Sequence, residues 1–188
     1  MEQQQRLTAS DFLTWLAKQS GDETYELVDA KVVRMETGTN IHGEIIERLS
    51  ELLAPIVRAK GCRKYSGSLG VFCTNGDVLV PDLVVTCDER DRPEPGKRGL
   101  RYPKLVIEVL SPSNDAATLR RKEDAYCGTP SLEEYVMIDS SRRWAQIWRR
   151  NVDGDFVRHP AFASLELETI ETVVSLDNLY ADLLSQTL

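Results

Sequence analysis

The chain has 188 residues, 41% of them hydrophobic and 28% charged, with a formal net charge of −7 at pH 7. This is the composition of an ordinary soluble protein, and the length predicts one domain over residues 1–188. No apolar stretch is long enough to cross a membrane, and the polar start, Met1 to Arg6, lacks the apolar core of a secretion signal. Four scattered cysteines without a C-x-x-C pair argue against zinc and a disulfide framework, so a reducing cytoplasm is the expected compartment.

The first half of the chain predicts a helix, a β-hairpin, a longer helix and four strands. Thr8 and Ser10 are candidate N-caps for the first helix, and apolar residues including Leu52 recur at three- and four-residue spacing in the second. In chain order, the expected elements lie at residues 10–18 (helix), 24–28 and 31–35 (hairpin), 41–60 (helix), and 62–65, 70–74, 78–85 and 105–110 (strands).

The second half begins with a helix over 116–127, because Asp115 is a strong capping residue and Gly128 with Pro130 stops the helix. A hairpin, a short β segment and a terminal helix are expected to follow, at residues 134–139 with 144–149, 166–174 and 176–184. Alternating strands and helices of this kind predict a mixed sheet flanked by helices, in the α/β class.

Two carboxylates stand inside hydrophobic runs that predict buried strands. Asp82 follows Pro81 in one run, and Glu108 interrupts another 26 residues later. A carboxylate buried without compensation is costly or loses its charge, so the pair predicts one shared cation on neighbouring strands. Carboxylate oxygens suit Mg²⁺ and Mn²⁺. The alternatives are that Asp82 caps the start of its strand and that Glu108 forms a buried ion pair with an arginine or lysine.

A wider set of residues carries a resemblance to a known family. Its segments are Tyr25-Glu26-Leu27-Val28-Asp29, His42, Val80-Pro81-Asp82-Leu83-Val84-Val85, Leu105-Val106-Ile107-Glu108-Val109-Leu110-Ser111-Pro112-Ser113, Lys122-x-x-x-Tyr126, Gly128-x-Pro130 and Glu134-Tyr135-Val136-Met137-Ile138-Asp139. Together they resemble the Uma-two family of predicted restriction endonucleases, in the PD-(D/E)XK (restriction-endonuclease-like) superfamily, over nearly the whole chain. The resemblance implies a restriction-endonuclease-like core with extra β-hairpins.

The same resemblance implies a Mg²⁺-dependent endonuclease that hydrolyses phosphodiester bonds in nucleic acid, with DNA as the expected substrate and Mn²⁺ as a substitute metal. Asp82, Glu108 and the backbone carbonyl of Val109 would hold the metal. Lys122 would position the attacking water and offset developing charge, as phosphoryl transfer requires. Glu26 would hold a second metal or fix the geometry of the first.

Two further residues have expected supporting roles. His42 precedes the long helix and would orient a site carboxylate or cap the helix, and Tyr126 lies one turn beyond Lys122 and would orient the lysine. The chain departs from the family pattern in two places. The superfamily lysine would stand at Leu110 and is moved to Lys122, and Ala30 replaces the glycine that usually follows the Tyr-Glu-Leu-Val-Asp turn.

Charge is unevenly distributed along the chain. Residues 90–122 hold nine Lys and Arg against four Asp and Glu, a balance of +5, whereas residues 151–188 hold one basic and seven acidic residues, a balance of −6. The basic stretch surrounds Glu108 and is the arrangement expected where a phosphate approaches. The alternative is that residues 90–98 form a solvated loop.

Two other functions stay open on the sequence. One is a non-catalytic binding or assembly module of the same fold, which the displaced lysine and the acidic net charge favour. The other is a phosphoesterase acting on small molecules, because no helix-turn-helix or zinc module is present for base recognition. A homodimer is expected, with an interface over the apolar hairpin side chains. Those side chains are Tyr135, Met137, Trp144 and Trp148.

Overall fold

A six-stranded mixed sheet forms the centre of the structure, a computed structural model that describes residues 6–36, 38–67, 69–112 and 114–184. Its order is β10-β9-β8-β7-β6-β3, and only β7 and β8 run parallel to each other. The strands are β3 (Arg63–Ser66), β6 (Leu83–Thr86), β7 (Leu105–Leu110), β8 (Glu134–Asp139), β9 (Ala145–Arg150) and β10 (Phe156–Ala161).

Two smaller antiparallel sheets and four helices surround this sheet. One small sheet has the order β2-β1-β5-β4, and the other is the pair β11-β12. Their strands are β1 (Tyr25–Val28), β2 (Lys31–Arg34), β4 (Val71–Phe72), β5 (Val78–Leu79), β11 (Ser164–Leu167) and β12 (Thr172–Ser175). The helices are α1 (Ala9–Leu16), α2 (Asn40–Ala59), α3 (Ala116–Cys127) and α4 (Leu176–Leu179), with 3₁₀ turns η1 (Glu89–Asp91) and η2 (Glu168–Ile170).

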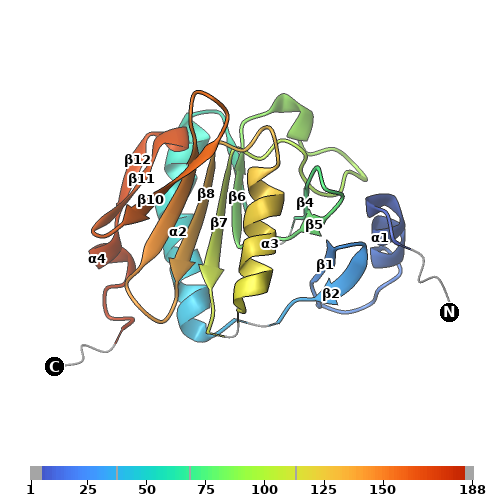
Figure 1. The fold of residues 1–188 in the computed structure, drawn as a ribbon, viewed down its shortest axis with the longest axis horizontal. Coiled ribbons are helices and arrows are strands. Elements are labelled where there is room, and N and C mark those ends of the chain that lie inside the picture. The colour runs from blue at the N-terminus through green and yellow to red at the C-terminus, as the bar shows by residue number, and fades with distance from the viewer. Residues whose placement is uncertain (1–5, 37, 68, 113, 185–188) are drawn as a thin grey trace.

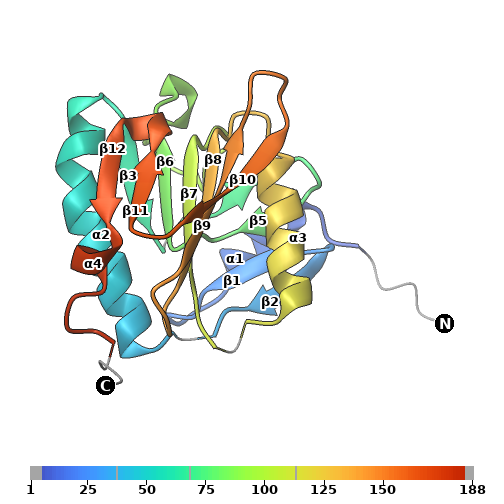
Figure 2. The ribbon, with the colours of Figure 1, turned by 60° about the vertical axis from the view of Figure 1, so that its left-hand side comes forward.

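Helices α2 and α3 cover opposite faces of the six-stranded sheet (Figure 1 and Figure 2). One face packs against α2, whose buried stripe is Ile45, Leu49, Leu53 and Val57. The opposite face packs against α3 and the β4–β5 region. The predicted helix over 41–60 is therefore confirmed, but Leu52 points outward with 46% of its surface exposed. None of the described helices has the length and hydropathy that a membrane crossing requires.

Alternation along β7 decides which way Glu108 points. Ile107 and Val109 pack into the core on the α2 face, whereas Val106 packs into the core on the α3 face. Because successive strand residues point to opposite faces, Glu108 shares the face of Val106 and points toward α3. The same rule applies to β1, where Leu27 packs with α1 and Glu26 points to the other side, toward the central sheet.

The predicted strand over 78–85 is wrong as one element. Residues 78–79 form β5 of the small sheet and 83–86 form β6 of the central sheet, so the chain passes from one sheet to the other at Pro81 and Asp82. Proline has no N–H for a ladder hydrogen bond, which explains why the strand breaks there. Asp82 therefore stands one residue before β6 and not within a strand.

The end of the chain also differs from the prediction. Strand β10 was not expected, the single segment over 166–174 is a hairpin interrupted by η2, and the terminal helix is only the four residues of α4. β10 has four exposed residues in succession, 157–160, because it lies at the edge of the sheet, so no period-two pattern marks it.

A disulfide joins Cys62 to Cys87, which corrects the expectation that the cysteines form no disulfide framework. Cys62 directly precedes β3 and Cys87 directly follows β6, and the register of these strands pairs Arg63 with Thr86. The two cysteines therefore face each other at the next position, with 4.2 Å between their Cα atoms. Sequence spacing could not show this, because it depends on register. The expectation of a reducing compartment loses its main support.

We expect reduction of this disulfide to destabilise the protein without unfolding it. The bond closes a loop of 25 residues, for which the chain-entropy model gives about 3.5 kcal/mol. Denaturant unfolding of the oxidised protein and of the Cys62→Ser/Cys87→Ser variant measures the difference. A Cys127→Ser variant is the control, since Cys127 is a free thiol. Equal midpoints for all three proteins would show that the bond does not form in solution.

Replacing Ala30 by glycine should stabilise the hairpin between β1 and β2. Asp29 and Ala30 form its two-residue turn with φ of 49° and 61°, a left-handed conformation that costs an alanine about 1 kcal/mol and costs glycine nothing. The Ala30→Gly variant should therefore gain close to that amount in the free energy of unfolding. Ala17→Gly, at a right-handed helix end, should lose stability instead. A loss in both variants would contradict the turn geometry.

Candidate functional site

Four charged side chains from distant parts of the chain converge between the central sheet, the β1–β2 hairpin and α3. They are Glu26 on β1, Asp82 before β6, Glu108 on β7 and Lys122 on α3, and all four line one pocket of about 300 Å³. The antiparallel register of β6 and β7 brings Asp82 and Glu108 together. Leu83 pairs with Ile107, so Asp82, one residue earlier, lies opposite Glu108. Both residues were predicted to lie on neighbouring strands near a common cation.

Lys122 lies between two buried carboxylates. Its Nζ is 3.0 Å from Oε1 of Glu26 and 3.1 Å from Oε1 of Glu108. The three side chains are 14%, 7% and 8% exposed, so the ion pairs are shielded from water. Glu26 also accepts a hydrogen bond from the backbone N–H of Val80, at 2.9 Å. Lys122, which the sequence analysis expects to act at the site, is therefore a buried group held by carboxylates from two strands.

Asp82 is fixed by the strand beside it and by the long helix. Its Oδ2 accepts a hydrogen bond from the backbone N–H of Val109 at 2.7 Å and lies 3.4 Å from Nε2 of His42. His42 stands in the first turn of α2, capped by Thr39. Of the two roles expected for His42, the structure shows the contact with a site carboxylate, while Thr39 caps the helix.

Tyr126 contacts the carboxylate and not the lysine. Its hydroxyl donates to Oε1 of Glu108 at 2.9 Å, and its ring is fully buried against Tyr135. The sequence placed Tyr126 correctly on the helix face of Lys122. Tyr126 and Lys122 meet on the same oxygen of Glu108, and the expectation that Tyr126 orients the lysine stays a prediction.

Burial and charge shift the proton affinities at this site. Burial raises the pKa of Glu108 to about 7, Lys122 opposes the shift, and the carboxylates of Asp82 and Glu26 add to it. Burial alone would lower the pKa of Lys122, but Glu108 and Glu26 outweigh it and raise that pKa. Lys122 is therefore a permanent cation, while Glu108 changes its protonation near neutral pH.

His42 is biased toward its charged form. The hydrogen bond to Asp82 raises the pKa of His42 despite the opposing effect of burial, and a backbone hydrogen bond to Val109 adds to the increase. The imidazole of His42 and the carboxylate of Asp82 are in contact beside β6 and β7. The backbone of Val109 contacts both partners.

The donors present are those of a hard cation. Asp82 uses Oδ2 for its contacts and Glu108 uses Oε1, so Oδ1 and Oε2 have no hydrogen bond to any residue that the structure describes. Within the described ranges, no group of three or more His, Cys, Asp or Glu side chains is arranged to hold a metal ion. Two carboxylates and a carbonyl fit Mg²⁺, which characteristically keeps water and substrate oxygens as its remaining ligands.

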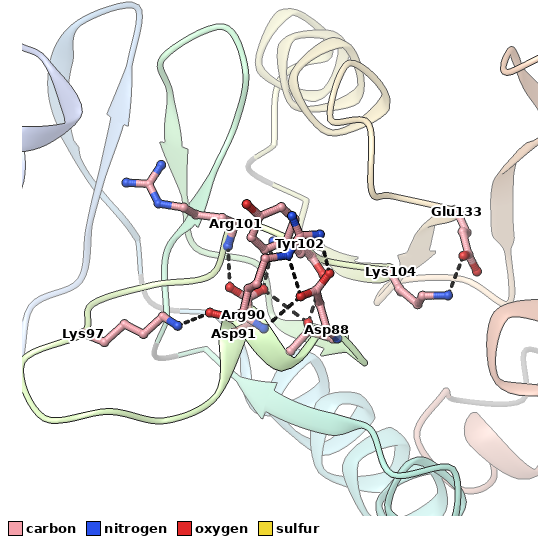
Figure 3. A network of polar contacts seen from close by, with 9 residues as sticks. Asp88, Arg90, Asp91, Lys97, Arg101, Tyr102, Lys104 and Glu133 are labelled. Carbon is pink, nitrogen blue, oxygen red and sulfur yellow. Dashed lines mark hydrogen bonds and ion pairs between the residues drawn. The ribbon is translucent and has the colours of Figure 1, made fainter.

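The basic stretch separates into two parts. Residues 88–104 form a loop at the far end of β6 and β7 from the site, where Arg90 pairs with Asp88 and Lys104 with Glu133 (Figure 3). Buried Asp91 organises the loop by accepting from the backbone N–H groups of Arg101 and Tyr102, at 3.0 and 2.8 Å. Only the α3 part of the basic stretch, with Lys122, belongs to the site.

The side chains expected at a dimer interface are core residues. Tyr135, Met137 and Trp148 are between 0% and 6% exposed and pack against α3, and Nε1 of Trp148 donates to Glu123 at 2.7 Å. Trp144 is half-buried against the same core. The interface predicted from these residues is therefore wrong, because alternation along the hairpin buries them inside the chain.

Several residues of the pocket were not expected from the sequence. They are Arg34 on β2, Asn114 and Asp115 at the start of α3, and Thr118 in its first turn. Asp115 was recognised only as the helix cap, which it is, since its carboxylate accepts from Ala117 and Thr118. The one available signal was position, because the residues just after the strand that carries Glu108 must lie near its end. Ser113, the last residue of the Leu105-to-Ser113 segment of the resemblance, lies outside the described residues.

The fold and site define a class of protein: an α/β fold with two carboxylates and a lysine at the end of a strand pair. A solved structure, from Anabaena variabilis and described as a "putative nuclease belonging to DUF820", shares this fold with a TM-score of 0.75 at 16% identity, over 93% of this chain and 97% of that one. The restriction-endonuclease-like fold expected from the sequence is therefore confirmed.

The family follows from two sequence comparisons. The model of the Uma2 family, described as "Putative restriction endonuclease", matches residues 9–180. The Synechocystis protein slr1290, described as uncharacterized, is 31% identical over 181 residues, which cover 95% of this chain and 93% of that protein. A second uncharacterized Synechocystis protein, sll1609, is 22% identical over 71% of this chain and 75% of its own length. The chain belongs to the Uma2 family.

Proposed function

We propose that this protein is a divalent-metal-dependent nuclease that hydrolyses phosphodiester bonds in DNA. The observation that carries the proposal is Lys122, a buried cation whose Nζ lies 3.1 Å from Glu108, which itself stands opposite Asp82. Two carboxylates with uncommitted oxygens beside a fixed ammonium group supply the charges that phosphoryl transfer requires. Membership of a family of this description supports the same conclusion.

Asp82, Glu108 and the Val109 carbonyl are the groups that would hold Mg²⁺, with Mn²⁺ as a substitute. When bound, the metal would polarise the phosphoryl oxygen and lower the pKa of a coordinated water. The Val109 N–H fixes the carboxylate of Asp82 through a hydrogen bond of 2.7 Å. His42, on α2, contacts the same carboxylate. The side chain of Asp82 is therefore held from both β7 and α2 and does not rotate freely when substrate arrives.

Lys122 would orient the attacking water and offset the negative charge that develops on the phosphoryl group. Glu26 positions this lysine, since its Oε1 binds Nζ and the Val80 N–H together. Between the two roles expected for Glu26, this geometry favours fixing the site over holding a second metal. Tyr126 fixes Glu108 in the same manner through its hydroxyl group.

The test is a cleavage assay with plasmid DNA, single-stranded DNA and RNA, each incubated with Mg²⁺, with Mn²⁺ and with EDTA. We expect strand breaks in DNA that require the metal and vanish in Asp82→Asn. A folded protein that binds DNA but never cleaves any of the three substrates would favour the binding-module alternative. The homodimer and the reducing cytoplasm are two further predictions. The cleavage assay tests neither of them.

A further inference from the structure

A second pocket lies on the other side of the small sheet from the candidate metal site. It has a volume of about 250 Å³ between α1, the small sheet and the loop at residues 97–99. Its lining includes three aromatic rings, those of Phe12, Tyr25 and Phe72. Because Tyr25 and Glu26 are successive residues of β1, one side chain lines this pocket while the other faces the site.

One wall of the pocket is formed by two backbone segments, at residues 70–72 and 99–100, that lie close together. Leu100 N–H donates to the carbonyl of Gly70 at 2.8 Å, and Phe72 N–H donates to the carbonyl of Leu100 at 2.9 Å. A Cβ on Gly99, whose φ is +79°, would lie 2.4 Å from the Gly70 carbonyl oxygen. The guanidinium of Arg101 covers the Phe72 ring at 4.3 Å. The ring and the wall are therefore fixed before any ligand enters.

The rim of the pocket carries one uncommitted positive charge. Lys97 is held by the backbone carbonyls of Arg90 and Arg92, and Glu23 is bonded to the Tyr25 hydroxyl and paired with Arg34. Figure 3 shows Lys97 directed toward Arg90. The exposed side chain of Arg98 has no ion-pair partner among the residues that the structure describes. It is free to meet an anion.

The pocket is continuous with the site through a larger hollow of about 840 Å³. Glu23, Thr24 and Gly67 line both the pocket and the hollow. Arg34, Met35, Glu36 and Asp82 line both the hollow and the site. The aromatic pocket, the hollow and the site therefore adjoin one another through shared lining residues.

We propose that this pocket binds one nucleobase of a nucleic-acid strand that is turned out of its stack, while Arg98 contacts the adjoining phosphate. The inference rests on the proposed nuclease function. Aromatic and apolar walls accept any base by its flat face, so the pocket would hold the strand without reading its sequence. A small, rigid, mostly apolar pocket beside a free cation matches a base with its phosphate.

The experiment measures binding in EDTA, so that no cleavage is needed. Fluorescence anisotropy compares a short oligothymidylate with an abasic deoxyribose-phosphate strand of equal length and charge. Stacking of one base is worth roughly 1–3 kcal/mol, so the wild type should prefer the oligothymidylate by about tenfold. Leu16→Trp, which fills the pocket from the end of α1, should abolish this preference and leave abasic binding unchanged.

Arg98→Ala should weaken binding of both strands. The control is Arg58→Ala, which removes an exposed arginine outside the pocket and should weaken the binding of each strand less than Arg98→Ala does. Circular dichroism checks that each variant is folded. Equal affinity of the wild type for the two strands, or no binding of either, would overturn the base pocket. The cleavage assay decides the nuclease function separately, so an active enzyme without base preference would reject the pocket alone.

Discussion

Replacing Lys122 by methionine should abolish most DNA cleavage and destabilise the fold. Methionine has a similar length without the charge, so Glu26 and Glu108 would remain buried without their common cation. Breaking a buried ion pair by removing one partner costs about 3–5 kcal/mol, and loss of a fixed charge or proton-transfer group at the reacting centre costs roughly 10²–10⁴ in rate. Denaturant unfolding and cleavage rates measure the two effects.

The matched control is Arg120→Met, which removes the same charge from the same helix at an exposed position. It should leave both stability and cleavage rate close to those of the wild type. Lys122→Arg keeps the charge and should recover much of the stability but little activity, because a planar guanidinium places its donors differently. If Lys122→Met cleaved DNA at the wild-type rate, Lys122 would have no part in the reaction.

Mn²⁺ should bind stoichiometrically to the wild type and far more weakly to Asp82→Asn and Glu108→Gln. Each substitution replaces a charged oxygen donor by a neutral amide. Loss of a residue that only supports a metal ligand already lowers metal affinity by about 10- to 100-fold, so loss of a ligand itself should lower the Mn²⁺ affinity by at least that much. Isothermal titration calorimetry measures the constants without any substrate. The control is Glu94→Gln, which removes an exposed carboxylate away from the site and should bind like the wild type.

The affinity for Mn²⁺ should also rise with pH through the neutral range. Burial raises the pKa of Glu108 to about 7, so below that pH the group is mostly protonated in the folded protein and must release its proton to bind metal. The affinity should therefore be about tenfold higher at pH 8 than at pH 6 and level off above that. Calorimetry at both pH values tests the sign, and an affinity that falls with rising pH would contradict it.

The buried lysine explains how the site stays folded before metal arrives. Glu26, Asp82 and Glu108 line the same pocket, and a low-dielectric environment would make their mutual repulsion costly without a counter-charge. Lys122 compensates Glu26 and Glu108, and His42 contacts Asp82. The protein can therefore hold these buried carboxylates together through its own side chains.

The sequence by itself determined the elements whose patterns are local. The Leu105–Leu110 strand and the Ala116–Cys127 helix have the predicted bounds, because a buried strand reads as an apolar run and a capped helix begins at Asp115 and ends before Gly128. Glu108 was recognisable for the same reason, as a charge that interrupts the run. The motif order was also sufficient for the family, since it needs no knowledge of contacts.

Tertiary structure alone decided which side chains meet. Asp82 faces Glu108 because of an antiparallel register, and the same kind of register pairs Cys62 with Cys87, which spacing had argued against. A one-residue shift in register would turn each side chain to the other face, and local patterns do not specify it. Lys122 looked like a surface residue in its helix, and it is buried because β1, from nearly a hundred residues earlier, brings Glu26 over it.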